Sequence, residues 1–340
     1  MPMLEPFVTD LDACEALAHA NLTLVPLAGG EGHGPEYHLA AEALEADLLT
    51  VTETSEAGTV PELLATTTAE VPVLLLDGEE LVGAKQNRIL NAAVLLPARA
   101  KTVIPVSCVE QGRWRHVGRD FRPGTVSPSR MRARKGRDVH LSLRARGRHE
   151  SDQAGVWDEV QEELADLGAA SPTMAMHDAV RHRERDLAAF LDALPYPDGA
   201  RGVFVAVNDR FAAVDLFGRA ATLRKVWPRL VTGYAMDALG RRDRREPAFQ
   251  PKGPKAVLER LGQVACEPYP SPGLGEDWRF AAEDVTGHAL VVDDACITLS
   301  AFPNDAAATD RDAADMQTPS GPRIQPPSKR GRKRLEPNGD

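Results

Sequence analysis

The sequence contains few cysteines, and their spacing is not that of a metal site or a disulfide framework. Four cysteines occur, Cys14, Cys108, Cys266 and Cys296, and no two of them form a CxxC pair. This scatter predicts neither a structural zinc ion nor a set of disulfide bonds. We therefore expect a protein of a reducing compartment.

Long apolar runs are absent as well. No run approaches the roughly 18 apolar residues that a membrane-spanning helix needs. The amino-terminal stretch MPMLEPFVTD lacks the basic region and apolar run of a secretory signal. These absences predict a cytoplasmic protein with no membrane partner. The frequent alanine, arginine and proline are typical of a GC-rich bacterial genome.

An excess of positive charge is also absent, because the net charge is −10 at pH 7. This balance argues against a general nucleic-acid coat. The charge is nevertheless uneven: twelve Arg or Lys residues and only two acids lie between Arg113 and Arg148. A predicted loop at 130–137 and the basic segment 329–334 keep a nucleic-acid partner open as an alternative, with salt-dependent binding.

The common motifs of nucleotide and hydrolase sites are missing. The sequence has no GxGxxG, no GxxxxGK[ST], no GxSxG and no HExxH. His33, Glu36 and His38 lie in a loop-like stretch without further ligands at a recognised spacing, so we expect no metal site. No cofactor is indicated.

The 340 residues, of which 43% are apolar, are enough for one large domain or two smaller ones. In the first half, short apolar runs alternate with turn signals, which favours strands in an antiparallel, sandwich-like sheet over about 22–112. Asp77-Gly78 predicts a two-residue hairpin turn between VPVLLLD and EELVG. Pro105 predicts an edge strand or a bulge.

A helical periodicity begins near Ser151. We expect one helix over 151–168 with Ser151 as its cap, and a second over 171–194 with Ser171 as cap and Pro172 at its first position. A third, over 221–240, should be kinked or interrupted at Pro228. A hairpin at Asn208-Asp209 and a closing strand pair over 288–302 complete an α+β fold.

The expected domain organisation follows from these patterns. It comprises an amino-terminal segment, 1–21, an α+β domain, 22–302, and a tail, 303–340. The tail is rich in Ala, Asp, Pro, Ser and Gly and lacks the apolar content to fold, so it should be disordered.

The stretch DGEELVGAKQNRILN, residues 77–91, places an unusual set of polar side chains between apolar runs. Glu79 and Glu80 are candidate general bases. Strand alternation would put Gln86 and Arg88 on one face and Lys85 and Asn87 on the other. Together with Asn91 they could bind a phosphate or a ribose. The alternative is an Arg–Glu network that braces a hairpin.

A second candidate stretch is VSCVEQGRWRH, residues 106–116. Cys108 is either a nucleophile, which needs a nearby base, or a small buried apolar residue. Glu110 has the same strand parity, Arg113 can hold a phosphate, and Trp114 can stack on adenine. We expect a single concave patch formed by Glu80, Gln86, Arg88, Glu110 and Arg113.

These strings, in the order LLTVTETSEAGTVPEL, VPVLLLDGEELVGAKQNRILN, TVIPVSCVEQGRWRH and SDQAGVWDEV, resemble the ARPP-1 family. That family is the domain associated with ADP-ribosylglycohydrolase and rhodanese–phosphatase superfamily proteins. The resemblance runs from about Leu22 to about Leu239. It implies a small-molecule partner, namely an ADP-ribose- or NAD-derived nucleotide that the protein binds or hydrolyses.

The candidate roles, which follow from the chemistry of the side chains, fall on residues that match the family's motifs. The candidate catalytic residues are Glu79, Glu80, Glu110 and Cys108. The candidate ligand-binding residues are Lys85, Gln86, Asn87, Arg88, Asn91, Arg113, Trp114 and Gln153. Trp157 also matches a family motif, although its place on a helix predicts core packing. Whether the protein is an enzyme or a non-catalytic interaction module stays open.

Overall fold

Three β-sheets carry the fold of residues 1–30, 34–54, 61–113, 121–241 and 253–304, which are the residues that the computed structural model describes. Met1–Asn304 form one compact unit. The predicted α+β class, with antiparallel sheets in the amino-terminal half and helices in the middle, is confirmed. The predicted disordered tail lies outside the described residues from 305 onward.

Two sheets built from the first half of the chain face each other. The larger has six strands, in the order β12 (Phe121–Val126), β8 (Glu79–Gly83), β9 (Arg88–Leu90), β11 (Lys101–Cys108), β6 (Glu62–Thr67) and β5 (Leu49–Glu53). The smaller has β10 (Val94–Leu96), β7 (Val73–Leu75) and β4 (His38–Leu39). Apolar side chains from both sheets form one buried cluster, which includes Leu75, Leu81, Leu90 and Val94. This is the predicted sandwich.

The predicted hairpin at Asp77-Gly78 is wrong. β7 and β8 belong to different sheets, and β8 instead pairs with β9 and β12. Gly78 has a φ of 71° and donates its N–H to Leu90 O, while Ser127 Oγ donates to Gly78 O. The dipeptide is therefore a corner that carries the chain from one sheet to the other.

Pro105 does not mark an edge strand, because β11 is an interior strand of its sheet. β11 pairs with β6 from Lys101 to Pro105 and with β9 from Val106 to Cys108. Proline has no N–H to donate, so it fits the point where one strand exchanges one neighbour for another.

The largest sheet joins the two ends of the chain. Its strands are β1 (Asp12–Ala13), β2 (Leu17–His19), β3 (Leu22–Ala28), β13 (Gly202–Val207), β14 (Arg210–Phe217), β18 (Ala295–Pro303), β17 (Val285–Val292), β16 (Glu276–Ala281) and β15 (Glu267–Pro270). The hairpin at Asn208-Asp209 and the closing pair β17–β18 are confirmed. The strand at 22–28 was expected in the sandwich, but it pairs with β13.

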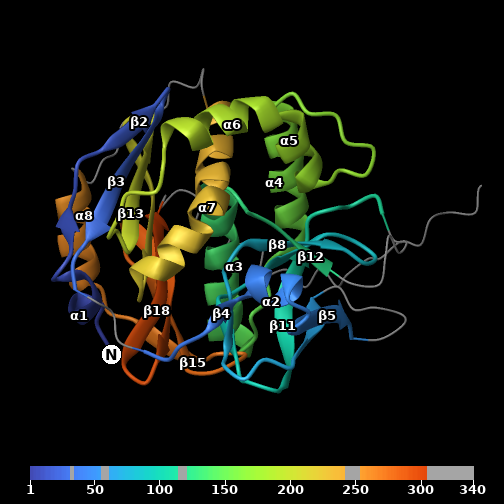
Figure 1. Ribbon diagram of the computed structural model, residues 1–340, viewed down its shortest axis with the longest axis horizontal. Helices are drawn as coiled ribbons and strands as arrows, with labels where there is room; N and C mark the ends of the chain where they lie inside the picture. Colours follow the sequence, from blue (N-terminus) through green and yellow to red (C-terminus); the bar gives the residue numbers. More distant parts are fainter. Residues whose placement is uncertain (31–33, 55–60, 114–120, 242–252, 305–340) are drawn as a thin grey trace, which may run out of the picture. The chain divides into compact units, whose positions relative to one another are not determined.

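Helices fill the space between the sheets and cover their faces. They are α1 (Glu5–Val8), α2 (Ala40–Glu45), α3 (Ser129–Arg146), α4 (Gln153–Asp166), α5 (Met176–His182), α6 (Glu184–Ala193), α7 (Ala220–Gly240) and α8 (Gly253–Gly262). In Figure 1, α3 and α7 occupy the middle, where α3 packs on β17 and α7 packs on both β12 and β13. α7 runs through Pro228, so the predicted interruption is wrong. No helix of the described part is long and apolar enough to cross a membrane.

Two predicted helix starts are corrected. The helix expected from Ser151 begins at Gln153, and Asp152 caps it by accepting hydrogen bonds from the N–H groups of Ala154 and Gly155. The helix expected over 171–194 is divided into α5 and α6, and Ser171 Oγ accepts a hydrogen bond from the N–H of Ala175.

The predicted basic loop at 130–137 is also wrong, because this segment belongs to α3. Arg132 and Lys135 are buried, whereas Arg130 and Arg134 pair with Glu159 of α4. The many charges of this segment were interpreted as those of a solvated loop, but Arg130, Arg132, Arg134 and Lys135 have acidic partners inside the fold.

Candidate functional site

Arg113 is the centre of a closed network. Its Nε donates to Glu110 Oε1 at 2.8 Å, its Nη1 to Ala84 O at 2.7 Å, and its Nη2 to Asn87 Oδ1 at 3.1 Å. Thr173 Oγ1 also donates to Glu110 Oε1 at 2.9 Å. Burial would raise the pKa of Glu110, but the hydrogen bonds from Arg113 and Thr173 lower it. Of the predicted residues, Glu110 and Arg113 therefore hold the loop of residues 84–87 in place.

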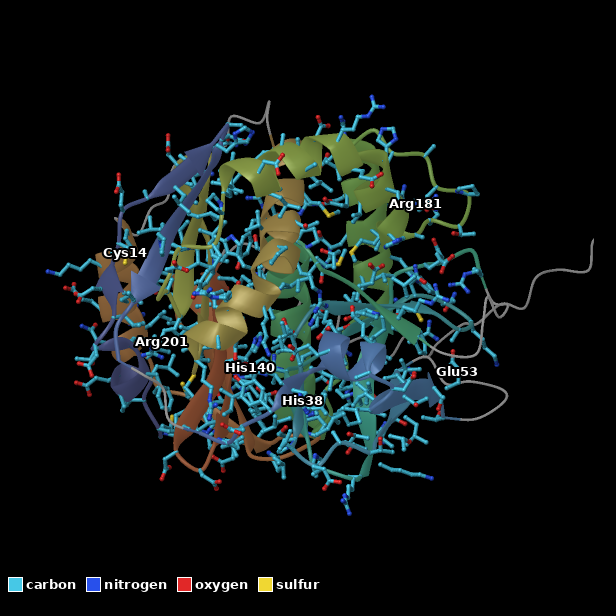
Figure 2. The ribbon with its side chains drawn as sticks, viewed as in Figure 1. Cys14, His38, Glu53, His140, Arg181 and Arg201 are labelled. Atoms are coloured by element: carbon cyan, nitrogen blue, oxygen red, sulfur yellow. The ribbon has the colours of Figure 1, made fainter. Side chains whose placement is uncertain are left out.

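Arg88 and Gln86 form a second, separate pair. Arg88 is fully buried and its Nη1 donates to Gln86 Oε1 at 3.1 Å, while its Nη2 lies 3.7 Å from Glu53 Oε1 of β5. Glu53 is labelled in Figure 2. Cys108 faces Arg88 across the β9–β11 pair, and burial raises the pKa of its thiol to about 11. Such a thiol is protonated near neutral pH, which disfavours a nucleophilic role.

Asn91 and Gln153 attach the segment before α4 to β11. The Gln153 amide makes two hydrogen bonds to the backbone of Cys108, at 2.8 and 2.9 Å. Asn91 Nδ2 donates to His149 O at 3.1 Å, and Ser107 Oγ donates to Asn91 Oδ1 at 2.8 Å. Both predicted ligand-binding residues therefore hold the backbone of 149–153.

Glu79 and Glu80 point in different directions, as strand alternation requires. Glu79 accepts hydrogen bonds from Arg229 Nη2 at 2.6 Å and from the Leu76 N–H at 2.9 Å, so both of its oxygens have partners. Glu80 is fully buried, and its Oε2 lies 3.2 Å from His177 Nδ1. Its other oxygen, Oε1, is buried with no hydrogen-bond partner in the described part of the chain.

His177 is the half-exposed member of this pair, with 34% of its side chain accessible. The hydrogen bond to Glu80 raises the pKa of His177 above its ordinary value. Gly124 makes room for the pair, because a Cβ at that position would lie 2.6 Å from Glu80 Oε2. Glu80 is thus a predicted residue whose partner, His177, is partly exposed.

The first turn of α5 and the segment before it contact two of the predicted residues, Glu110 and Glu80. The segment before it contacts Glu110 through Thr173 and through a bridge at Ala175, and His177 contacts Glu80. Lys85 is buried within the 84–87 loop. Trp114, which was expected to stack on a base, lies outside the described residues.

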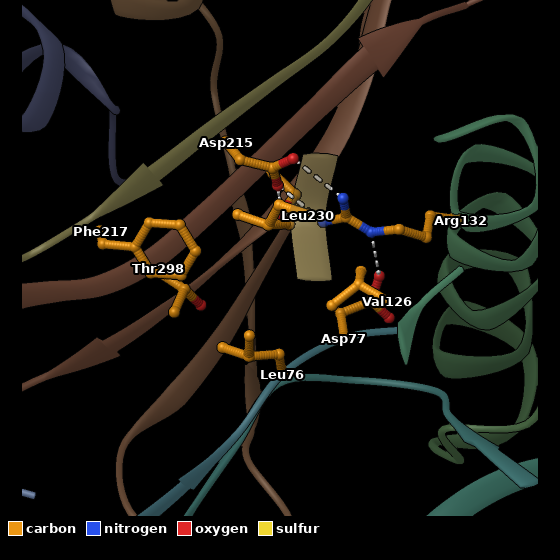
Figure 3. A pocket seen from close by; sticks show the side chains of 9 residues that line it. Leu76, Asp77, Val126, Arg132, Asp215, Phe217, Leu230 and Thr298 are labelled. Atoms are coloured by element: carbon orange, nitrogen blue, oxygen red, sulfur yellow. Dashed lines mark hydrogen bonds and ion pairs between the residues drawn. The ribbon is translucent and has the colours of Figure 1, made fainter. Parts of the chain in front are cut away.

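A second buried set of charges was not predicted from the sequence. We call it the core ion network; it consists of Asp77, Arg132, Lys135, Asp215, Tyr234 and Ser300. Figure 3 shows Asp77, Arg132 and Asp215 of this network. Arg132 donates to both oxygens of Asp215, at 2.9 and 2.7 Å, and to Ser300 Oγ at 2.8 Å. Lys135 donates to Asp77 and, at 2.7 Å, to Leu90 O. Tyr234 donates to Asp215.

Burial shifts the pKa values in this network. Burial would raise the pKa of Asp215, but the charge of Arg132 and its hydrogen bonds lower it. Burial lowers the pKa of Lys135 and raises that of Tyr234 well above its usual range. His288, 3.6 Å from Asp77 Oδ2, has its pKa lowered by burial to about 4 and is neutral near pH 7.

The core ion network surrounds a cavity of about 10 Å³, lined by Asp77, Arg132, Asp215 and Ser300 (Figure 3). A space of this size holds about one water molecule. Asp77 Oδ2 and Arg132 Nε, from two residues that line this cavity, have no hydrogen-bond partner within the described residues.

A larger groove, of about 430 Å³, lies where β15, β11 and the residues after α3 meet. Pro105, Arg148, His149 and Tyr269 are among its lining residues. His149 Nε2 lies 3.0 Å from Asp277 Oδ2, and the same oxygen accepts hydrogen bonds from Arg279. His149 was not singled out from the sequence, since its carboxylate partner is 128 residues away.

Metal ligands do not gather at any of these places. Within the described part of the chain, no group of three or more His, Cys, Asp or Glu side chains could hold a metal ion. His38 lies in β4, and His33 lies outside the described residues.

The comparison with known families gives one match. The chain matches ARPP-1, described as the ARG and Rhodanese-Phosphatase-superfamily-associated Protein domain, over residues 10–302. No curated protein matches the chain, and no solved structure matches it. The matched range contains the Arg113 network, the Glu80–His177 pair, the core ion network and the groove.

Proposed function

Since the chain belongs to the ARPP-1 family, we propose that it binds or hydrolyses an ADP-ribose- or NAD-derived nucleotide, with Glu80 at the centre of the site. The family description associates this domain with ARG and rhodanese–phosphatase proteins, and that setting supports an ADP-ribose-linked ligand. The description concerns the family's associates, so the ligand and the chemistry are our proposal.

One observation carries the proposal: the carboxylate of Glu80 is fully buried, yet its Oε1 has no partner among the described residues. Leaving a buried charged acceptor unpaired costs more than the roughly 1–3 kcal/mol of a neutral group. A ribose hydroxyl or a water molecule would supply the missing donor. His177, its hydrogen-bond partner, is 34% exposed, so the pair reaches the surface through the His177 ring.

Other residues of the family motifs complete the proposal. We assign Lys85, Gln86 and Asn87 to ligand contact, and Asn91 and Gln153, whose amides bond to the protein, to holding the segment before α4. Trp114 would stack on the adenine.

Other residues of the set hold the loop. Arg113 and Glu110 fix the 84–87 loop, because their hydrogen bonds are made within the protein. Glu79 fixes β8 to α7 through Arg229. Arg88 holds Gln86, and Cys108 holds Gln153 through its backbone.

In hydrolysis, Glu80 would be the general base. Its Oε1 would accept a proton from a water molecule as the oxygen of that water bonds to C1 of the ribose; the glycosidic bond at C1 breaks, and the leaving group departs and takes a proton from solvent. His177, which shares a hydrogen bond with Oε2, orients the carboxylate. If the protein only binds its ligand, the same oxygen accepts a hydrogen bond from a ribose hydroxyl.

Calorimetric titration tests the proposal. We expect ADP-ribose or NAD to bind with a Kd below about 1 mM, and Glu80→Gln to weaken binding at least about tenfold, as for the loss of a charged hydrogen bond. Glu283→Gln, at an exposed position between β16 and β17, is the matched control and should bind as the parent does. Absence of heat with both ligands at millimolar concentration would overturn the proposal.

A non-catalytic interaction module is the second candidate, and the closed Arg113 network favours it. If the family motifs only brace the fold, Arg113→Ala and Glu80→Gln should change thermal stability and leave ligand titrations unaltered. The nucleic-acid alternative has lost support at 130–137, where Arg132 and Lys135 are buried. The segment 329–334 lies outside the described residues, and a gel shift with and without 303–340 tests it.

A further inference from the structure

His149 lies in the wall of the groove, with a buried carboxylate behind it. We infer that the groove is a second ligand site that takes a ribosyl phosphate, in which His149 Nδ1 accepts a hydrogen bond from a sugar hydroxyl. The choice of a ribosyl ligand rests on the proposed function, whereas the site itself rests on the geometry of the groove.

Asp277 determines which ring nitrogen of His149 is available. Burial opposes ionisation of Asp277, but Arg279 and the hydrogen bond from His149 hold its pKa well below the usual range. The ionised carboxylate accepts, so Nε2 of His149 carries the proton. With the proton on Nε2, the tautomer that accepts at Nδ1 has its lone pair there, and none of the described residues hydrogen-bonds to that atom.

The backbone on either side of His149 is fixed, which gives the ring a defined position. Asn91 donates to His149 O at 3.1 Å. Two residues later, Ser151 Oγ lies 2.6 Å from Ser107 Oγ of β11. The ring is therefore held by Asp277 at one side and by its own backbone at the other, as a preorganised acceptor requires.

The remaining lining matches a sugar phosphate. A volume of about 430 Å³ is within the range of roughly 300–1,000 Å³ for small-molecule sites. Tyr269 and Pro105 present flat apolar surfaces to a sugar ring, and the Glu62 and Glu150 carboxylates can accept hydrogen bonds from its hydroxyls.

Arg148 supplies the positive charge for the phosphate. Its side chain is 70% exposed, and it contacts Glu150 at 3.3 Å. An exposed ion pair of this kind is worth at most about 1 kcal/mol, so the guanidinium can turn to a phosphate at little cost. A guanidinium can hold two phosphate oxygens at once.

Nuclear magnetic resonance of the histidine rings tests this site in the full chain, with ribose 5-phosphate as the probe. We expect the probe to shift the His149 Nδ1 resonance and the Tyr269 ring signals while leaving those of His182, an exposed histidine of α5, unchanged. His149→Gln should weaken binding of the probe at least tenfold, and the matched control His182→Gln should not. Unshifted His149 and Tyr269 signals at millimolar probe would overturn the inference, even if the His149 variant fails to fold.

Titration with ADP-ribose separates this inference from the proposed function. If Glu80→Gln abolishes ADP-ribose binding while ribose 5-phosphate leaves His149 unshifted, the proposed function survives and the groove site fails. If ribose 5-phosphate shifts His149 but neither ADP-ribose nor NAD binds, the groove site survives and the proposed function fails. Ribose without phosphate should bind more weakly than ribose 5-phosphate, and equal affinity would remove the role given to Arg148.

Discussion

The Arg113 network and the core ion network are both buried and charged, but they are built differently. The Arg113 network is largely local: its members lie within residues 83–113, except Thr173, and each guanidinium nitrogen of Arg113 has a partner. The core ion network joins α3, α7, β14 and β18, and Arg132 Nε is 3.6 Å from Asp77 Oδ2 without a hydrogen bond. The first network shapes a loop, whereas the second ties separate layers together.

This difference has an energetic consequence. A buried ion pair contributes little over a well-packed apolar pair, but removing one partner leaves an uncompensated buried charge. Because the core ion network is fully buried and spans the fold, its disruption should affect global stability. Disruption of the Arg113 network should affect mainly the 84–87 loop.

The largest effect is expected for Asp215→Ala. The substitution leaves Arg132 without its bidentate partner, so we expect the free energy of unfolding to fall by about 3–5 kcal/mol, measured by urea denaturation. The control Asp192→Ala, at an exposed position of α6, should change stability by no more than about 0.5 kcal/mol. The double variant Arg132→Met/Asp215→Leu should recover much of the loss. If Asp215→Ala and Asp192→Ala were equal, the core ion network would have no role in stability.

Arg113→Ala should have a smaller effect, a loss of about 2–3 kcal/mol, because charged hydrogen bonds of one local loop are removed. Arg113→Lys should restore only part of the loss, because an ammonium group cannot reproduce the fork of donors. Urea denaturation measures the stability, and hydrogen exchange of residues 84–87 measures the loop. Arg122→Ala, at an exposed position of β12, is the control. A loss as large as that of Asp215→Ala would remove the distinction between the two networks.

Glu163 of α4 is a buried carboxyl group that lies near another acidic residue, Asp237. Burial, with Asp237 nearby, raises its pKa to about 8 from 4.5. The folded state therefore binds the proton of Glu163 more tightly than the unfolded state does. Protonation of Glu163 contributes stability in full below about pH 4.5, and this contribution is lost as the pH rises to about 8. We expect a fall of at most about 1.4 kcal/mol per pH unit. Glu163→Gln should flatten the stability profile between pH 5 and 8, and an unchanged slope would contradict the shift.

The smallest effect is expected at the Glu80–His177 pair. Glu80→Gln should lower the pKa of His177, because the hydrogen bond to Glu80 is the main cause of its raised value. The pair stabilises the fold below the unfolded pKa of His177, and this contribution is lost as the pH rises through the folded pKa. Titration of the His177 ring by magnetic resonance measures the shift, with His182 as the internal control. A His177 pKa that does not change would show that the two side chains are not coupled in solution.

The sequence predicted the elements of the fold better than their arrangement. Strand-period alternation and helical periodicity located β3, β13, β14, α4 and the β17–β18 pair, because these signals are local. The pairing of Leu22–Ala28 with Gly202–Val207 joins segments about 180 residues apart, and no local signal specifies it. The corner at Gly78 has the residues of a hairpin turn, but contacts with Ser127 and Leu90 determine its course.

The candidate site shows the same limit. Glu110 and Arg113 were predicted to lie in one patch because both stand at the end of the same predicted strand, and the structure joins them in an ion pair. His177 and Asp277 were missed, because their partners Glu80 and His149 are 97 and 128 residues away. Arg132 and Lys135 were assigned to a solvated loop, since a run of charges usually marks the surface. Their burial depends on Asp215 and Asp77, which come from other elements.

The change of neighbour along β11 has a mechanical consequence. Pro105 is the last residue of β11 that pairs with β6, and β9 takes over at Val106. Pro105 O accepts a hydrogen bond from the Asn91 N–H at 3.0 Å, and the Val106 N–H donates to Pro61 O at 2.9 Å, so the junction is tied to both neighbouring segments. The ring of Pro105 also fixes its own φ, which stiffens the strand at this point. Because Pro105 lines the groove, a molecule bound there would lie against a stiff wall.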